Sequence, residues 1–345
     1  MKIVFRCDAN EATGLGHLSR SLALAEALRR AGGEARFVGH WSGPAFTLLA
    51  AAGMESRPAK FTTGTTADAA ELVRCVSVED ADGACVDSYA IDAAWLANVA
   101  ADGVAVVLID DFARLSDYGD CAGVLNFTVD SPRLDYSGLA TERRALGPNY
   151  FPARENLLRL RLGTCRRVAT VRSRILIALG GGDRLGLTLP LYHSLRRLQP
   201  GVQVRALLPD GPARAGVEGL NVEDFPAPAG DLAAHYAWAE ACVTGGGLVK
   251  YECAYLGLPL AIFSQTPEQQ AETERFLAAG FGWDLAPAGR ADGWEMRLGE
   301  FLRPGATAQI TGGRFPSDSA DRAMAALQRF LRCAAPMSVS LVCSK

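Results

Sequence analysis

Short apolar runs alternate with longer segments of helical periodicity along most of the chain. The runs hold consecutive apolar residues rather than alternating apolar and polar ones, which is typical of parallel strands covered on both faces. The pattern therefore predicts an α/β protein. Strands are predicted at 3–5, 35–39, 84–88, 104–111, 123–127, 174–179, 202–209, 241–244 and 258–264, and helices after 16, at 44–53, 91–101 and 187–197, from 248 to about 256 and at 318–333.

The same order of elements occurs twice, on either side of a polar, proline-bearing stretch between 130 and 172. Each half opens with an apolar strand that runs into a glycine-rich turn. A chain of 345 residues also exceeds what one hydrophobic core usually serves. We therefore predict two Rossmann-like domains that face each other across a cleft. Their predicted bounds are 1–150 and 173–335, with a linker at 151–172 and a tail at 336–345.

The first glycine-rich turn ends in Gly14-Leu15-Gly16-His17 and leads directly into a helix. Glycine lets the backbone turn tightly and approach a ligand, and the unpaired N–H groups at the helix start face that ligand. The partial positive charge of the helix end is expected to favour neutral imidazole, the form that a general base needs. The turn by itself is compatible with a catalytic His17 and equally with a capping or structural one.

The second half contains two further glycine turns. Gly180-Gly181-Gly182-Asp183 follows one predicted strand, and Gly245-Gly246-Gly247 follows another and precedes a helix that carries Glu252. Such turns hold phosphate oxygens on backbone N–H groups, although each one alone could be a plain tight turn. Neither matches Gly-x-x-x-x-Gly-Lys-Ser/Thr, and the first half lacks Gly-x-Gly-x-x-Gly. These absences disfavour a P-loop nucleotidase and a dinucleotide dehydrogenase.

Polar residues at predicted strand ends supply the remaining candidates. Asp87 could act in a site or cap the next helix, and Tyr89 could act beside it or simply pack. The pair Asp110-Asp111 could bind a metal or orient His17, or it could divide between the cleft and a cap. Asp80-Ala81-Asp82 fits the Asp-x-Asp of metal-dependent transferases, but it lies before its strand and is attributed to chance.

Net charge, the length of apolar runs and cysteine spacing limit the classes of partner and cofactor that we expect. The formal net charge is −3, which gives no reason to expect nucleic acid or an anionic membrane as a partner. No apolar run approaches the ~20 residues of a membrane helix, so no membrane insertion is expected. The nine cysteines show no Cys-x-x-Cys and no zinc spacing. We predict a cytoplasmic protein without a metal, disulfide or cofactor.

Several segments resemble a known family. FRCD (5–8) followed by GLGHLSR (14–20) is similar to the opening of the UDP-sugar hydrolases of pseudaminic acid biosynthesis and of related spore-coat polysaccharide proteins. A more remote likeness is to the lipid II UDP-GlcNAc transferases, which have the GT-B fold. The resemblance continues in order through VDSYAID (86–92), LIDDFA (108–113), VLNFTVD (124–130), GPNYFPARENL (147–157), IALGGGD (177–183) and GGGLVKYECAYLGLP (245–259). Leu248 and Val249 depart from it, because relatives often place Ser or Thr there.

The resemblance implies a metal-independent enzyme of GT-B architecture that releases UDP from a UDP-linked diacetamido-trideoxy sugar by water attack with inversion. It implies that His17 is the general base, that Asp87 or Tyr89 positions water or sugar, and that Glu252 holds the ribose. The implied substrate-binding positions are Gly14, Gly16, Gly180, Gly181, Gly182, Asp183, Gly246, Gly247 and Leu248. Two alternatives stay open: a GT-B glycosyltransferase with another acceptor, and a nucleotide-sugar-binding protein without turnover.

Overall fold

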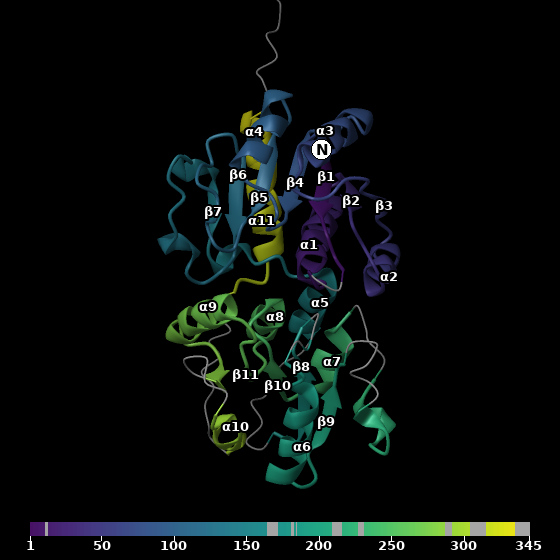
Figure 1. Cartoon of the computed structure of the whole chain (residues 1–345), viewed down its shortest axis with the longest axis vertical. Helices are drawn as coiled ribbons and strands as arrows, with labels where there is room; N and C mark the ends of the chain where they lie inside the picture. Colours follow the sequence, from purple (N-terminus) through teal and green to yellow (C-terminus); the bar gives the residue numbers. More distant parts are fainter. Residues whose placement is uncertain are drawn as a thin grey trace, which may run out of the picture.

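The computed structural model describes residues 1–10, 13–163, 172–180, 183, 185–208, 216–226, 231–286, 292–303 and 315–334. Two bodies lie one above the other along the long axis of the molecule, and each is built on its own sheet (Figure 1). Among the described residues, no helix is both long enough and apolar enough to pass through a membrane.

The first sheet has seven parallel strands among the described residues, in the order β3-β2-β1-β4-β5-β6-β7. The strand order reverses between β1 and β4, and the edge outside such a switch point is where open α/β sheets bind ligands. Helices α1 and α2 pack on one face of this sheet and α3 and α4 on the other. The bounds are β1 Lys2–Cys7, α1 Gly16–Arg30, β2 Glu34–Gly39, α2 Pro44–Ala51, β3 Glu55–Pro58, α3 Thr66–Val78, β4 Gly83–Asp87, α4 Ala93–Ala101, β5 Val106–Ile109, β6 Gly123–Asn126 and β7 Arg144–Leu146.

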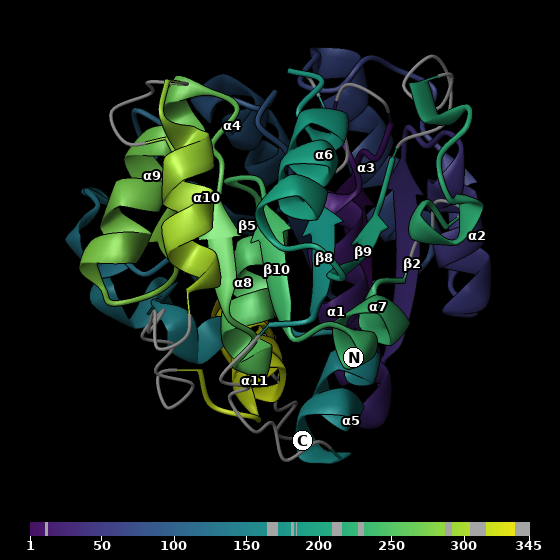
Figure 2. The same ribbon diagram turned by 90° about the horizontal axis from the view of Figure 1, so that it is seen from below.

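The second sheet has five parallel strands among the described residues, in the order β12-β11-β10-β8-β9, and its order reverses between β8 and β10. Helices α6 and α10 cover one face and α7 and α8 the other (Figure 2). The bounds are α5 Glu155–Gly163, β8 Arg174–Ala178, α6 Thr188–Leu198, β9 Gln203–Ala206, α7 Ala233–Trp238, β10 Ala241–Thr244, α8 Leu248–Leu256, β11 Leu260–Ile262, α9 Pro267–Ala278, β12 Trp283–Asp284 and α10 Trp294–Leu302.

The α/β class and the two parallel sheets predicted from the sequence are confirmed. The sequence analysis missed the short edge strands β3, β7 and β12, because runs of two to four residues carry little hydrophobic pattern. The predicted linker 151–172 contains helix α5, which packs against α7 and α8.

Helix α11 (Ser319–Ala334) follows the second sheet in sequence but packs on the first. It contacts α1, β5 and β6, and in Figure 1 it is the yellow helix within the upper body. Two glycines make room for it, because a Cβ atom on Gly123 would lie 2.3 Å from the ring of Phe330 and one on Gly83 2.8 Å from Leu331. The predicted domain 173–335 included this helix, whereas its contacts are with the first half.

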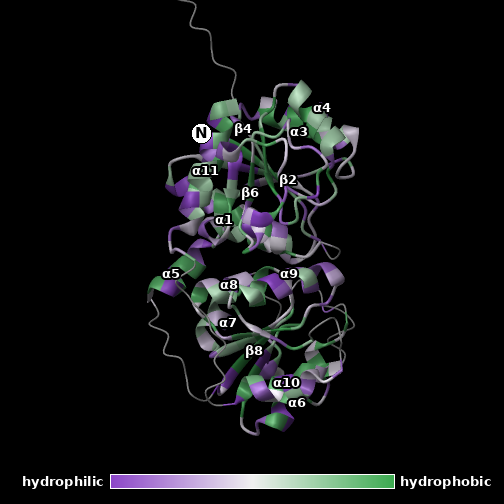
Figure 3. Cartoon of the chain, turned by 90° about the vertical axis from the view of Figure 1, so that its left-hand side faces the viewer, coloured by the Kyte–Doolittle hydropathy of each residue, from purple (hydrophilic) through white to green (hydrophobic). Residues whose placement is uncertain are grey.

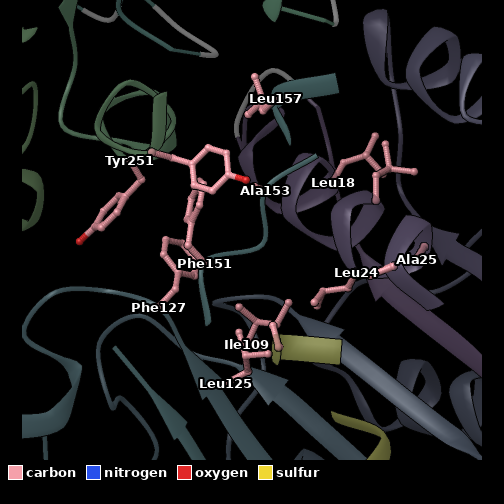
Figure 4. Packing of buried hydrophobic residues seen from close by; sticks show 14 of the residues in the cluster. Leu18, Leu24, Ala25, Ile109, Leu125, Phe127, Phe151, Ala153, Leu157 and Tyr251 are labelled. Atoms are coloured by element: carbon pink, nitrogen blue, oxygen red, sulfur yellow. The ribbon is translucent and has the colours of Figure 1, made fainter. Parts of the chain in front are cut away.

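Aromatic side chains join the two bodies. The ring of Phe127, just after β6, lies 5.4 Å from that of Phe151 and 5.2 Å from that of Tyr251 in α8 (Figure 4). The backbone N–H of Val129 donates to the Tyr251 hydroxyl at 3.3 Å. Burial of such rings contributes about 1.5–3 kcal/mol each, so this contact stabilises the packing of the two bodies against each other.

Candidate functional site

His17 lies in the first turn of α1, at the switch point of the first sheet. Its Nδ1 lies 3.0 Å from the backbone oxygen of Asp87, the last residue of β4, and 3.0 Å from the Oδ1 of that residue. Because both neighbours are acceptors, Nδ1 carries the hydrogen and Nε2 is the basic nitrogen. The sequence analysis offered Asp110 or Asp111 to orient His17, whereas the structure gives that role to Asp87, with the tautomer that a general base requires.

Asp87 is fully buried and ionised. Arg20, one turn further along α1, donates to its Oδ2 at 2.5 Å from Nε and to its Oδ1 at 2.6 Å from Nη2. Burial alone raises the pKa of the carboxyl, but Arg20 and His17 outweigh burial and lower the pKa to about 2. A permanent negative charge thus lies beside the imidazole.

That charge corrects the expectation that the helix end keeps His17 neutral. Burial lowers the pKa of the imidazole, but the nearby Asp87 carboxylate raises it by more, so the pKa lies above the usual 6.5. A charge at 3 Å acts more strongly than the fractional charge of a helix terminus. His17 is therefore a stronger base than an isolated histidine.

Arg20 also joins Asp87 to Asp111, which follows β5. Its Nη1 donates to Oδ2 of Asp111 at 2.5 Å, and the Tyr89 hydroxyl donates to the same oxygen at 2.5 Å. The Tyr89 ring meets the His17 ring edge-on with centroids 4.6 Å apart. The structure thus brings together the three predicted catalytic residues His17, Asp87 and Tyr89 and adds Arg20 and Asp111.

Asp110 has a different role from its neighbour. Its carboxylate accepts hydrogen bonds from the backbone N–H groups of Phe112 and Arg114 and from the hydroxyl of Tyr118. It therefore holds the loop after β5. Among the described residues, no group of three or more His, Cys, Asp or Glu side chains could hold a metal ion.

The first glycine turn of the second half is described only in part. Gly180 has φ +99°, a left-handed conformation that favours glycine, whereas Gly181 and Gly182 lie outside the described residues. Asp183, a predicted substrate-binding residue, accepts from the backbone N–H groups of Leu187 at 2.7 Å and Thr188 at 2.8 Å. Both its oxygens therefore hold the start of α6.

The second turn leads from β10 into α8. A Cβ atom on Gly245 would lie 2.4 Å from the Leu179 carbonyl oxygen, and one on Gly246 would lie 2.6 Å from Cβ of Gln269. Gly247 has no atom within 4 Å of such a Cβ, so the chain is open there. Helix α8 then begins without a side-chain cap, which leaves its first N–H groups unpaired by a capping side chain.

Lys250 stabilises this turn from the protein interior. It is fully buried, its Nζ donates to the Gly246 carbonyl oxygen at 2.7 Å, and it forms an ion pair with Glu272 of α9. The sequence analysis missed this residue, as it missed Arg20. The only signal was position, since Lys250 follows the glycines by one helical turn and Arg20 lies three residues after His17 on the same helix face.

Glu252 lies in the second turn of α8 and is 8% exposed. Its Oε2 accepts a hydrogen bond from the Tyr236 hydroxyl at 2.5 Å. Burial raises the pKa of its carboxyl to about 7, despite this hydrogen bond and the charge of Arg154. Besides the Tyr236 hydroxyl, a buried carboxylate can accept further hydrogen bonds from a ligand hydroxyl.

Helices α1 and α8 lie on the sides of the two bodies that face each other (Figure 3). A Cβ atom on Gly16 would lie 3.9 Å from Cβ of Leu248. Gly16 of the first half is thus brought to Leu248 of the second, and Gly14, two residues before Gly16, has φ +70°. The predicted site residues that meet here lie at the two switch points, with uncapped helix ends on both sides.

Neither a protein-family model nor a curated protein matches this chain. Solved structures do match it. The UDP complex of S. aureus MnaA has a TM-score of 0.67 at 11% identity, covering 96% of this chain and 97% of that one. A Listeria monocytogenes protein assigned as a UDP-N-acetylglucosamine 2-epimerase has a TM-score of 0.62 at 13% identity, covering 96% of each chain.

The glycosyltransferase SnogD from Streptomyces nogalater has a TM-score of 0.57 at 17% identity, covering 97% of this chain and 99% of that one. All three similarities extend over nearly the whole chain. The chain has the GT-B fold, as the sequence analysis predicted. At 11% to 17% sequence identity, the similarity establishes the fold of this chain but not its substrate or its reaction.

Proposed function

We propose that this protein hydrolyses a UDP-linked sugar, releasing UDP and the free sugar. The observation that carries the proposal is the position of His17, a histidine with an ionised Asp87 partner, at the helix start that faces the uncapped start of α8. A diphosphate held by α8 would lie next to a base able to activate water. The fold shared with UDP-bound MnaA supports a nucleotide ligand.

In the proposed reaction, water attacks the anomeric carbon while the bond from that carbon to the diphosphate oxygen breaks. One water proton passes to Nε2 of His17, and UDP leaves with the bonding electrons. Asp87 stabilises the imidazolium as it forms, and Arg20 fixes Asp87. Attack from the face opposite the leaving group inverts the anomeric configuration.

The second half would bind the nucleotide. Backbone N–H groups at the start of α8 and of the turn Gly245–Gly247 would stabilise charge that develops on the departing diphosphate. Leu248 and Val249 offer no hydroxyl, so this stabilisation would come from the backbone. Glu252 would accept hydrogen bonds from the ribose. The resemblance to the pseudaminic acid hydrolases favours a diacetamido-trideoxy sugar.

A panel of UDP- and CMP-sugars incubated with pure protein and no acceptor tests the proposal. Free sugar and free UDP in stoichiometric amounts are expected from at least one UDP-sugar. A bound donor that stays intact without an acceptor would instead support a transferase or a binding protein. A UDP-sugar returned with altered ring configuration would support an epimerase.

Exhaustive chelation is expected to leave turnover unchanged. Both oxygens of Asp110 hold backbone and tyrosine donors, and helix N–H groups would serve the diphosphate in place of a cation. Initial rates measured with and without EDTA check this expectation. Loss of turnover in EDTA with recovery in Mg²⁺ or Mn²⁺ would make Asp111 a metal ligand and contradict the electrostatic assignment.

Glu252→Ala is expected to weaken UDP binding by about 1–3 kcal/mol, because ribose hydroxyls would lose a buried acceptor. Calorimetric titration of UDP measures the change. Glu300→Ala on α10, which covers the opposite face of the second sheet, is the matched control. Equal UDP affinity in Glu252→Ala and wild type would contradict the ribose assignment.

If Glu252 binds the ribose, its raised pKa should make UDP affinity depend on pH near neutrality. The ionised carboxylate is the better acceptor, so UDP affinity should increase as pH rises through about 7. The terminal phosphate of UDP also titrates, with a pKa of about 6, so the contribution of Glu252 is the difference between the wild type and Glu252→Ala, which should show the smaller rise. An equal rise in the two proteins would assign the titration to another group.

A further inference from the structure

Asp111 has one oxygen held by two donors and one that no donor among the described residues reaches. Its Oδ2 accepts from Arg20 Nη1 and from the Tyr89 hydroxyl, each at 2.5 Å. Its Oδ1 is buried, and no donor among the described residues reaches it. The side chain as a whole is 10% exposed. A buried carboxylate oxygen without a donor is uncommon in folded proteins and points to a missing ligand group.

The neighbouring carboxylates are different. Asp87 receives Arg20 on both oxygens and His17 on one, and Asp110 receives three donors. Of these three carboxylates, only Asp111 has an oxygen without a donor within the described part of the chain. Within this group of carboxylates the missing donor is therefore specific to one atom.

Rotation of the side chain does not supply the missing donor. Arg20 comes from α1 and Tyr89 from the loop after β4, and the two hold Oδ2 from different elements. Turning Oδ1 toward either would remove a hydrogen bond from Oδ2. The carboxylate is thus fixed in orientation, as a residue that recognises a ligand must be.

The position and charge of Asp111 limit what the ligand group can be. Asp111 lies just beyond β5 at the switch-point edge, and its partner Tyr89 packs against His17. A carboxylate repels a diphosphate but accepts from neutral donors. A sugar hydroxyl or the N–H of an acetamido group has the required chemistry.

We propose that Asp111 Oδ1 accepts a hydrogen bond from the sugar of the bound nucleotide sugar, through a hydroxyl or an amide N–H. This assignment rests on the proposed function for the location of the ligand and makes Asp111 a determinant of sugar specificity. Tyr89 and Arg20 then act as positioning residues for Asp111, in addition to their contacts with His17 and Asp87.

Titration of UDP and of UDP-N-acetylglucosamine into the wild type and Asp111→Asn tests the assignment. The amide keeps the shape but can present only one oxygen, which Arg20 and Tyr89 require, so its NH₂ would face the sugar donor. Affinity for UDP-N-acetylglucosamine should fall about tenfold to hundredfold while affinity for UDP stays unchanged. Asp321→Asn, in the exposed ion pair of α11 with Arg30, is the matched control.

Each outcome decides a different claim. Equal losses for both ligands, or no loss for either, would overturn the sugar contact while leaving the nucleotide site in place. UDP-N-acetylglucosamine that binds wild type no more tightly than UDP would also overturn it. A wild type that binds neither ligand would instead contradict the proposed function.

A crystal structure of the wild type with UDP-N-acetylglucosamine gives an answer that does not depend on the folding of a variant. A sugar oxygen or nitrogen within hydrogen-bond distance of Oδ1 is expected. A water that occupies Oδ1 in the presence of the bound sugar, with no sugar atom in reach, would show that the oxygen serves a structural water only and would overturn the proposal.

Discussion

Replacing His17 by alanine is expected to lower kcat by about 10²–10⁴-fold, the contribution of a positioned general base. UDP affinity should change little, because the nucleotide would be held by α8 and its glycine turn in the other half. Steady-state kinetics with a turned-over UDP-sugar, together with UDP titration, measure both quantities. His193→Ala on the exposed side of α6 is the matched histidine control.

The pH profile adds a readout specific to the base. Since Asp87 raises the pKa of His17 above 6.5, kcat in the wild type should increase as pH rises through that pKa. The residual activity of His17→Ala should lack this rise. Near-wild-type turnover in the alanine variant, or an unchanged pH profile, would remove His17 from the mechanism.

Arg20→Met is expected to lower the free energy of unfolding by about 3–5 kcal/mol at neutral pH. The substitution removes the buried guanidinium that holds Asp87 and Asp111, which leaves Asp111 without a cation and Asp87 with the imidazole of His17 alone. Urea denaturation of the variant and the wild type measures the loss. Arg30→Met, which breaks an ion pair at the surface of α1, should cost no more than about 1 kcal/mol.

The sign of the pH dependence follows from Asp87. Its pKa is about 2 in the folded protein against 3.8 normally, so its stabilising contribution is present above pH 3.8 and disappears as pH falls toward 2. The deficit of Arg20→Met should therefore be largest near neutral pH and shrink on acidification. A loss below about 1 kcal/mol at neutral pH would contradict the structural role of Arg20.

Most strand positions and the presence of His17, Asp87 and Tyr89 in one site could be anticipated from the sequence, whereas the direct contact of His17 with Asp87 could not. Continuous apolar runs indicate parallel strands, and residues at the carboxyl ends of neighbouring strands meet at one edge of the sheet. Arg20 could not be anticipated, because an arginine in an alanine-rich helix is typical of a solvated surface. Its function depends on which face of α1 lies toward β4, a tertiary property.

The packing of α11 on the first sheet could not be predicted from the sequence for a similar reason. Its amphipathic pattern shows that one face is buried but does not say against which sheet. Gly83 lies 248 residues before its partner Leu331, and Gly123 lies 207 residues before its partner Phe330. The pKa of His17 likewise depends on Asp87, which lies 70 residues away in the sequence. The prediction of a neutral imidazole considered only the start of α1 and therefore missed this contact.

Water attack at the anomeric carbon is the central claim, and hydrolysis in H₂¹⁸O followed by mass spectrometry of the released UDP tests it most directly. Cleavage between the anomeric carbon and the diphosphate oxygen places no oxygen from water in UDP. We therefore expect unlabelled UDP together with free sugar. Released nucleotide that carries ¹⁸O on phosphorus would show attack at the diphosphate and contradict the roles proposed for His17 and the start of α8.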